Sequence, residues 1–310
     1  MPLGITLFYT QRSARVINYG EGVALGASLV WASTSLVLRT LSQHQPSALI
    51  TAIRCGISGP FFWMLLPFGP PLSTLVNVPL HEWGLLIGSV FIGIVIGDQL
   101  YLHAMKEIGV SRTMALVGTL PITTLIWEQL LLDVPVTHTF IFGCVLAASG
   151  VILLSQRPRK KRQDTQEHPI RLKRGIIFAL LTALLWGLST TMLKPAMTHL
   201  TSIQANSVRM PLVAMALFGI WRLNQGRGNL RDIGWRTFAL IALTGLLGMG
   251  FGSFFYVEAV LFIGPAKTAT LTTATPVLSL ILAVIFLKEQ ITLRLLAGVA
   301  LCVAGVLLVL

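Results

Sequence analysis

The sequence has little charge for its length. Only 11% of its 310 residues are Asp, Glu, Lys or Arg, and 54% are hydrophobic. A soluble domain carries roughly 25% charged residues. The mean hydropathy of +0.79 lies far on the apolar side. These values exclude a soluble enzyme, a disordered regulator and a coiled coil, and they indicate an integral membrane protein in contact with the lipid bilayer.

Cysteine is also scarce, and the motifs of catalytic and metal sites are missing. Cys55, Cys144 and Cys302 lie far apart in apolar stretches, without metal-ligand spacing. We expect them to be packing residues rather than a disulfide framework or a metal site. The patterns HExxH, GxSxG and GxGxxG are absent, the last even from the glycine-rich run 248–252. The sequence therefore predicts no cofactor, no metal and no enzymatic activity.

The net charge of +12 does not indicate a nucleic-acid partner. The basic residues occupy short loops between apolar runs, as in cytoplasmic loops beside anionic lipid. Loops 1–2, 3–4, 5–6, 7–8 and 9–10, numbered by the predicted helices they join, hold 17 Lys and Arg residues, and the opposite side holds four. This bias predicts that both chain termini lie outside the cytoplasm.

Ten segments are apolar and long enough for membrane helices, which need about 20 residues each. They cover residues 20–40, 46–67, 83–104, 110–132, 137–155, 174–194, 202–222, 234–258, 264–287 and 291–310. The stretch 156–173 is polar and basic and contains two prolines, so it predicts a cytoplasmic linker. The predicted fold is an all-α membrane protein with five-helix domains at 17–155 and 174–310.

The two halves align without a gap when the chain is shifted by 155 residues. Residues 17–155 against 172–310 give 139 pairs, of which 29 are identical. Less common residues match in one register: Trp31/Trp186, His44/His199, Arg54/Arg209, Tyr101/Tyr256 and Pro121/Pro276. Because five spans is an odd number, the second copy would enter the membrane from the opposite side. Inverted repeats of this kind are typical of secondary transporters, with the substrate site at the repeat interface near the midplane.

These residues resemble the EamA-type branch of the drug/metabolite transporter superfamily. The resemblance rests on an ordered set that occurs in both halves, with the glutamate after the fourth helix present as Glu289 only. The set is Trp31 and Trp186, Arg54 and Arg209, the Tyr-x-x-Ala motifs Tyr101–Ala104 and Tyr256–Ala259, and Pro121 and Pro276. It implies ten helices in two EamA domains around a central cavity, and transport of small metabolites, often amino acids, without ATP.

Two features depart from what the resemblance implies. The first half has Val134 where the second has Glu289, and Asp133 is the residue that would substitute. Many members of the family have both termini in the cytoplasm, opposite to the charge bias. The sequence leaves the orientation open between these two alternatives.

The paired arginines have two interpretations. A guanidinium inside the membrane can bind a carboxylate of the substrate through two hydrogen bonds. Alternatively, Arg54 and Arg209 are structural, bonding to carbonyls or reaching to a helix end. Trp31 and Trp186 likewise either line the cavity or pack between helices.

The remaining polar residues of the spans break the repeat symmetry. Asp98 matches Ser253, His103 matches Glu258, and Glu128 matches Ala283. An intramembrane carboxylate or histidine can carry a coupling proton or meet a substrate ammonium, or it can be a charge near headgroups. Asp98, His103 and Glu258 are the candidates for coupling. The predicted substrate-binding residues are Trp31, Arg54, Asp98, Gln99, Tyr101, Glu128, Trp186, Arg209, Tyr256 and Glu258.

Together these features predict a secondary transporter of small polar metabolites or amino acids. It would work by alternating access, driven by a proton or substrate gradient, in a bacterial inner membrane. The alternative is a non-transporting membrane scaffold or regulatory subunit, although the short loops offer it little soluble surface.

Overall fold

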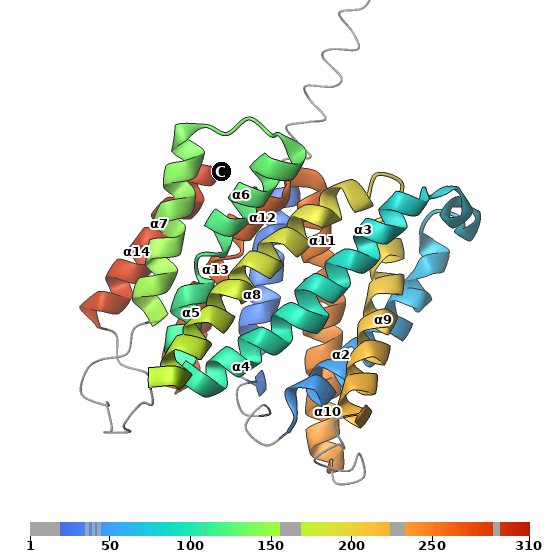
Figure 1. Cartoon of the computed structure of the whole chain (residues 1–310), viewed down its shortest axis with the longest axis horizontal. Helices are drawn as coiled ribbons and strands as arrows, with labels where there is room; N and C mark the ends of the chain where they lie inside the picture. The colour runs from blue at the N-terminus through green and yellow to red at the C-terminus, as the bar shows by residue number, and fades with distance from the viewer. Residues whose placement is uncertain are drawn as a thin grey trace, which may run out of the picture.

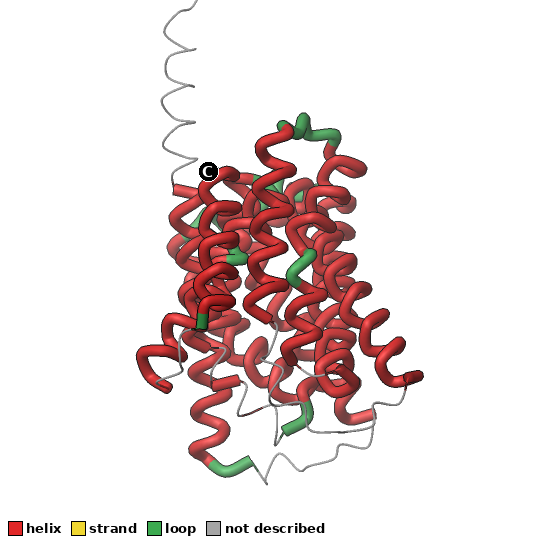
Figure 2. Tube along the Cα trace, turned by 90° about the vertical axis from the view of Figure 1, so that its left-hand side faces the viewer, coloured by secondary structure: helices red, strands yellow, loops and turns green. Residues whose placement is uncertain are grey.

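The chain folds into a bundle of helices that stand side by side (Figures 1 and 2). The computed structural model describes residues 19–34, 37–38, 41, 45–108, 110–155, 169–223, 233–287 and 292–310. Within these ranges all regular structure is helical. Satisfying every backbone group inside one helix is what a lipid environment requires of the chain.

The first half contains a helix over residues 19–34 and the elements α2 to α7. Their bounds are α2 (Ser47–Leu65), η1 (Leu66–Phe68), η2 (Leu72–Asn77), α3 (Leu80–Val90), η3 (Phe91–Gly97), α4 (Asp98–Ile108), α5 (Val110–Val117), α6 (Leu120–Leu132) and α7 (His138–Ser155). The second half contains α8 (Pro169–Ala196), α9 (Ser202–Leu223), α10 (Trp235–Thr244), η6 (Gly245–Gly252), α11 (Ser253–Ile263), α12 (Pro265–Leu271), α13 (Ala274–Leu287) and α14 (Leu293–Val309).

Six helical stretches of the described residues are long and apolar enough to cross a membrane. They are Ser47–Phe68, Leu80–Ile108, Arg112–Leu132, Arg171–Ala196, Ser202–Leu223 and Trp235–Ile263, and His138–Leu154 and Leu293–Val309 are shorter apolar helices. Large apolar side chains lie exposed on the outside of the bundle, such as Met64 (74%) and Met215 (64%). Such a surface is stable against lipid and not against water.

The third predicted span of each half contains a π-helical segment that the sequence pattern does not reveal. In the first half η3 joins α3 to α4, and in the second half η6 joins α10 to α11. The two segments are equivalent, because Gly93 and Gly97 of η3 fall on Gly248 and Gly252 of η6 after the shift of 155. A π-helix lengthens the loop closed by each hydrogen bond and is often found at functional sites.

The fourth predicted span of each half is interrupted. A turn at Gly118–Thr119 separates α5 from α6, and a turn at Thr272–Thr273 separates α12 from α13. The matched prolines, Pro121 and Pro276, lie in the first turns of α6 and α13. Proline is tolerated there because the first N–H groups of a helix have no intrahelical acceptor.

Equivalent helices from the two halves pack against each other in antiparallel pairs. In α7 and α14, Gly143 approaches Gly305 and Gly150 approaches Gly298. The shift of 155 residues converts one contact into the other, because Gly143 is equivalent to Gly298 and Gly150 to Gly305. Cys302, which is equivalent to Ala147, donates a hydrogen bond from Sγ to the Ala147 carbonyl at 3.6 Å. Glycine at the crossing lets the two backbones approach closely, which is how helices associate in lipid.

The same exchange holds for α2 and α9. Gly56 faces Ala214 and Gly59 faces Pro211, so each contact is the image of the other. The expectation that the cysteines are packing residues is also met, since all three are free and buried.

Replacing Gly150 by alanine tests the α7–α14 contact. The added Cβ would meet the backbone nitrogen and the sulfur of Cys302. We expect the free energy of unfolding to fall by about 1–3 kcal/mol through overpacking, measured by thermal unfolding in detergent. The matched control is Gly219→Ala in α9, where nothing lies within 4 Å, and which should leave stability unchanged or slightly raised. Equal effects of the two substitutions would contradict the close approach.

Candidate functional site

Two tryptophans join the halves through reciprocal hydrogen bonds. Trp31 Nε1 donates to the carbonyl of Gly248 at 2.9 Å, and Trp186 Nε1 donates to the carbonyl of Gly93 at 3.1 Å. Each indole therefore reaches from the first helix of one half into the π-helical segment of the other. The tryptophan side chains are half-buried.

Each tryptophan also contacts the tyrosine that follows that π-helical segment. The ring centroids of Trp31 and Tyr256 are 5.1 Å apart, and those of Tyr101 and Trp186 are 5.2 Å apart, with an interplanar angle of 42° in both pairs. The tyrosine hydroxyls have different partners, because Tyr256 bonds to Thr190 at 2.7 Å and Tyr101 donates to the sulfur of Met114 at 2.9 Å. The paired rings form the centre of the candidate site.

Glycine is required where the indoles meet the π-helical segments. A Cβ on Gly97 would collide with the ring of Trp186, and a Cβ on Gly252 would collide with the ring of Trp31. The four-residue spacing places Gly93 beside Gly97 and Gly248 beside Gly252 on one helix face. One glycine of each pair then supplies the carbonyl and the other supplies the space for the ring.

Asp98 gives one tryptophan a second acceptor. Trp186 Nε1 lies 3.0 Å from Asp98 Oδ1, in addition to its bond to Gly93. At the equivalent place in the other half, the Ser253 hydroxyl donates to Asn206 Oδ1 at 3.1 Å. The symmetry of the two halves therefore breaks next to the aromatic pairs.

Both arginines are buried and differ in their surroundings. Arg54 is 7% exposed, its Nη2 lies 3.5 Å from the Thr244 carbonyl, and its charge interacts with that of Asp98. Arg209 is 5% exposed, and its Nη1 donates to Asn206 Oδ1 at 3.1 Å. Neither Nε atom has a hydrogen-bond partner among the described residues.

Glu128, His103 and Gln99 have surroundings that differ from those of the aromatic pairs. Glu128 accepts a hydrogen bond from the Ala266 backbone N–H at 2.9 Å, at the start of α12. A carboxylate there stabilises the positive end of the helix dipole. His103 is exposed, and its Nδ1 lies 2.7 Å from the Gln99 carbonyl of its own helix. The side-chain nitrogen of Gln99 is buried without a partner.

Glu258 connects three helices near one end of the bundle. Its carboxylate accepts hydrogen bonds from Ser202, the first residue of α9, and from the Tyr19 hydroxyl at 3.4 Å. The nearby ion pair between Glu21 and Lys267, 2.6 Å apart, also joins the two halves. Glu289 lies outside the described residues, and Asp133 is an exposed residue that ends α6 in a left-handed conformation.

The sequence analysis did not select Asn206 or Ser253. Both are buried beside Arg209, Asn206 fully so. A signal was present, because Asn206 is a polar side chain inside an apolar span and matches Thr51 rather than another amide. Asn206 is not among the predicted site residues because it carries no charge.

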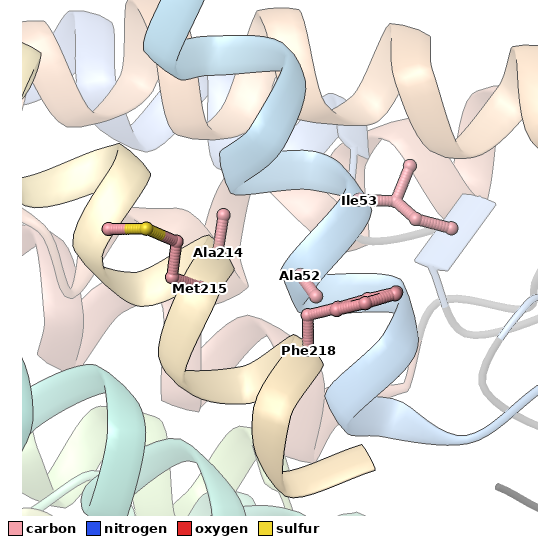
Figure 3. Close-up of a pocket in the computed structure, with 5 residues that line it drawn as sticks. All are labelled: Ala52, Ile53, Ala214, Met215 and Phe218. Carbon is pink, nitrogen blue, oxygen red and sulfur yellow. The ribbon is translucent and has the colours of Figure 1, made fainter. Parts of the chain in front are cut away.

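No group of three or more His, Cys, Asp and Glu residues in the described chain is arranged to hold a metal. A groove of about 270 Å³ lies between α2 and α9 and is lined by Ala52, Ile53, Ala214, Met215 and Phe218 (Figure 3). None of the predicted site residues lines it, and its side chains offer no polar group for recognition.

The sequence profile of the EamA-like transporter family matches residues 18–156 and 173–310. The chain belongs to this family. The two matched segments are the two halves that exchange the tryptophan contacts. Membership in the drug/metabolite transporter superfamily, inferred above from the ordered motifs, is thereby confirmed.

A curated relative supports the same conclusion for this EamA-like transporter. The uncharacterized transporter YyaM of Bacillus subtilis (strain 168) is 24% identical over 170 residues, which make up 53% of this chain and 55% of that protein. The chain thus spans about half the length of the relative it matches. Family and relative indicate a membrane transporter rather than an enzyme.

A solved structure shares the fold of this EamA-like transporter. It is described only as "Crystal structure of protein", and it superposes with a TM-score of 0.76 over 93% of this chain and 95% of its own, at 17% identity. At that identity the likeness concerns the fold alone.

Replacing each tryptophan by phenylalanine tests the hydrogen bonds while keeping an aromatic ring. We expect Trp186→Phe to lower the free energy of unfolding by about 1.5–3 kcal/mol, because one lost bond ends on a carboxylate. We expect Trp31→Phe, which loses only the bond to Gly248, to cost about 0.5–1.5 kcal/mol. Thermal unfolding of the purified variants measures both losses in the free energy of unfolding. Equal losses would contradict a stabilising hydrogen bond between Trp186 and Asp98.

Proposed function

We propose that this protein is a secondary transporter of small polar metabolites or amino acids that works by alternating access. The observation that supports it is the reciprocal bonding of Trp31 to Gly248 and of Trp186 to Gly93. Two equivalent halves that hold each other through the same contacts have two nearly equivalent ways to tilt against one another. Each tilt opens the interface to a different side of the membrane.

The proposed topology is ten membrane helices in two inverted five-helix repeats, at 17–155 and 174–310. Antiparallel packing of α7 on α14 and of α2 on α9 supports the inversion, because equivalent helices run in opposite directions. The linker 156–173 would lie in the cytoplasm of a bacterium, with the protein in the inner membrane. The transported solute would pass between the aromatic pairs.

A proton gradient can drive the cycle through Asp98. Its carboxylate is half-buried, contacts the Trp186 N–H at 3.0 Å and lies within electrostatic reach of Arg54. Protonation would weaken the attraction to Arg54 and change the acceptor available to Trp186. The other coupling candidates are His103, which follows Asp98 in α4, and Glu258, which lies in α11 of the other half.

Flux into reconstituted vesicles tests transport and coupling together. Vesicles with the wild-type protein should take up at least one solute from a panel of amino acids and small metabolites under an imposed gradient. If one proton is coupled, this flux should change by up to about tenfold per pH unit over the range in which the coupling group titrates. In Asp98→Asn vesicles the flux should lose its pH dependence, because the amide cannot bind and release the proton.

The matched control is Asp133→Asn, at an exposed carboxylate that ends α6. Asparagine also adopts the left-handed conformation found there, so the fold should be kept. This variant should retain the wild-type pH profile. Absence of flux for every solute would contradict the transporter, and an unchanged profile in Asp98→Asn would contradict coupling at Asp98.

A reporter that is active only in the cytoplasm tests the topology. The excess of Lys and Arg in the loops on the linker side predicts an inactive reporter when it is fused after Leu310. The same reporter inserted within 156–173 should be active and serves as the control. Activity after Leu310 would reverse the orientation and favour cytoplasmic termini.

A further inference from the structure

Arg209 is a buried charge without a carboxylate beside it. Its side chain is 5% exposed, and the titratable groups that interact with it are the hydroxyl of Tyr256 and the thiol of Cys55. Among the described residues no Asp or Glu lies within ion-pair distance of it. Arg54 also has no Asp or Glu of the described residues within ion-pair distance, but the charge of Asp98 is close enough to interact with it, and no carboxylate has that role for Arg209. An uncompensated buried charge is costly, so its retention needs a partner that is not part of these residues.

Asn206 presents an unpartnered donor next to this guanidinium. Its Oδ1 accepts hydrogen bonds from Arg209 Nη1 and from the Ser253 hydroxyl, both at 3.1 Å. These two donors fix the orientation of the amide, because its nitrogen could not accept them. The Nδ2 group is therefore directed elsewhere, and no described residue is its partner although Asn206 is 0% exposed.

The Nε of Arg209 is unpartnered as well, and the two residues lie one helical turn apart on α9. Positions separated by three residues share one face of a helix. Two N–H donors, one of them charged, are thus buried on neighbouring positions of α9 without an acceptor among the described residues. Leaving a buried donor of this kind unsatisfied destabilises the folded state.

Comparison of the halves shows what is missing. The first half has Thr51, Arg54 and Asp98 at the places where the second has Asn206, Arg209 and Ser253. The second half therefore has one negative charge fewer and one amide donor more around the same arginine. Its interior is short of an anionic acceptor.

We propose that Arg209 and Asn206 form the binding site for the anionic oxygen group of the transported solute, a carboxylate in the first instance. A carboxylate has two oxygens that can accept from Arg209 Nε and Asn206 Nδ2, and its charge offsets the guanidinium. Ser253 is a positioning residue, because it orients the Asn206 amide. The inference rests on the proposed transport function and narrows its substrates to solutes that carry such a group.

The test uses the smallest carboxylate as its probe. The purified full-length protein in detergent is unfolded thermally in sodium acetate, in acetamide with sodium chloride at the same ionic strength, and in sodium chloride alone. We expect acetate to raise the melting temperature in a saturable way and the neutral, similarly shaped acetamide to leave it unchanged. A parallel series with sodium phosphate distinguishes the possible anions. A rise in melting temperature with phosphate but not with acetate overturns the proposal that the site binds a carboxylate.

Two variants assign the effect to these residues. Asn206→Thr introduces the residue of the first half and removes Nδ2, and it should weaken the dependence on acetate by at least about tenfold in concentration. Arg209→Lys keeps the charge but lacks the planar donors, and it should weaken the dependence likewise. The control is Trp221→Phe, which removes another buried and unpartnered N–H from α9 and should respond to acetate as the wild type does.

The outcomes are separable from those of the transport experiment. An acetate response that is absent, or that persists unchanged in both variants, overturns the anion site even if vesicles show flux. An acetate response that both variants lose supports the site even if no solute in the panel is transported. In active vesicles, transport of a neutral solute at the same rate by the wild type and by Asn206→Thr would also overturn the anion site.

Discussion

The structure depends on an indole N–H that finds its acceptor in the other half of the chain. In lipid a polar group without a partner is costly, and helices cannot rely on the hydrophobic effect to hold them together. Trp31 and Trp186 meet this constraint by donating to carbonyls of the π-helical segments η6 and η3. These two bonds are related by the repeat, and further bonds such as Ser58 to Gly245 and Ser189 to Ser89 also join the halves.

Polar contacts also hold the two halves together near one end of the bundle. One end has Glu21 paired with Lys267, and Glu258 bonded to Tyr19 and Ser202. Among the residues that the structure describes, these polar contacts, unlike the Trp–Gly bonds, have no equivalent in the other half, so the halves are similar in packing and distinct in charge. Under the proposed alternating access, a tilt of the halves would break these contacts at one end without an equivalent loss at the other, so the two states would differ in free energy.

Much of this could be predicted from residue identity. The shift of 155 residues gave the pairs Trp31/Trp186 and Tyr101/Tyr256, and the structure places each tryptophan against a tyrosine of the opposite half. The π-helical segments could not be predicted, because their glycines fit an α-helical face equally well and hydropathy does not report hydrogen-bond register.

The details of the polar interior were harder to predict for a related reason. Which polar group faces which depends on rotamers and on small helix displacements, not on periodicity. The paired arginines looked equivalent in sequence, and only the contacts of Asn206 and Asp98 distinguish them. Glu128 was predicted as a substrate-binding residue because of its charge. In the structure its carboxylate accepts a hydrogen bond from the backbone of α12. The position of a charged residue within a span does not reveal such a partner.

The π-helical segments also bear on the history of the chain. A π-helical turn accommodates one extra residue while the helix on either side keeps its place, so it is the structural trace of an inserted residue. An insertion that followed the duplication would be found in one half only. Both halves have the segment with its glycines in register, Gly93 with Gly248 and Gly97 with Gly252. On that reasoning the widened helix belongs to the repeat itself rather than to one half of the chain.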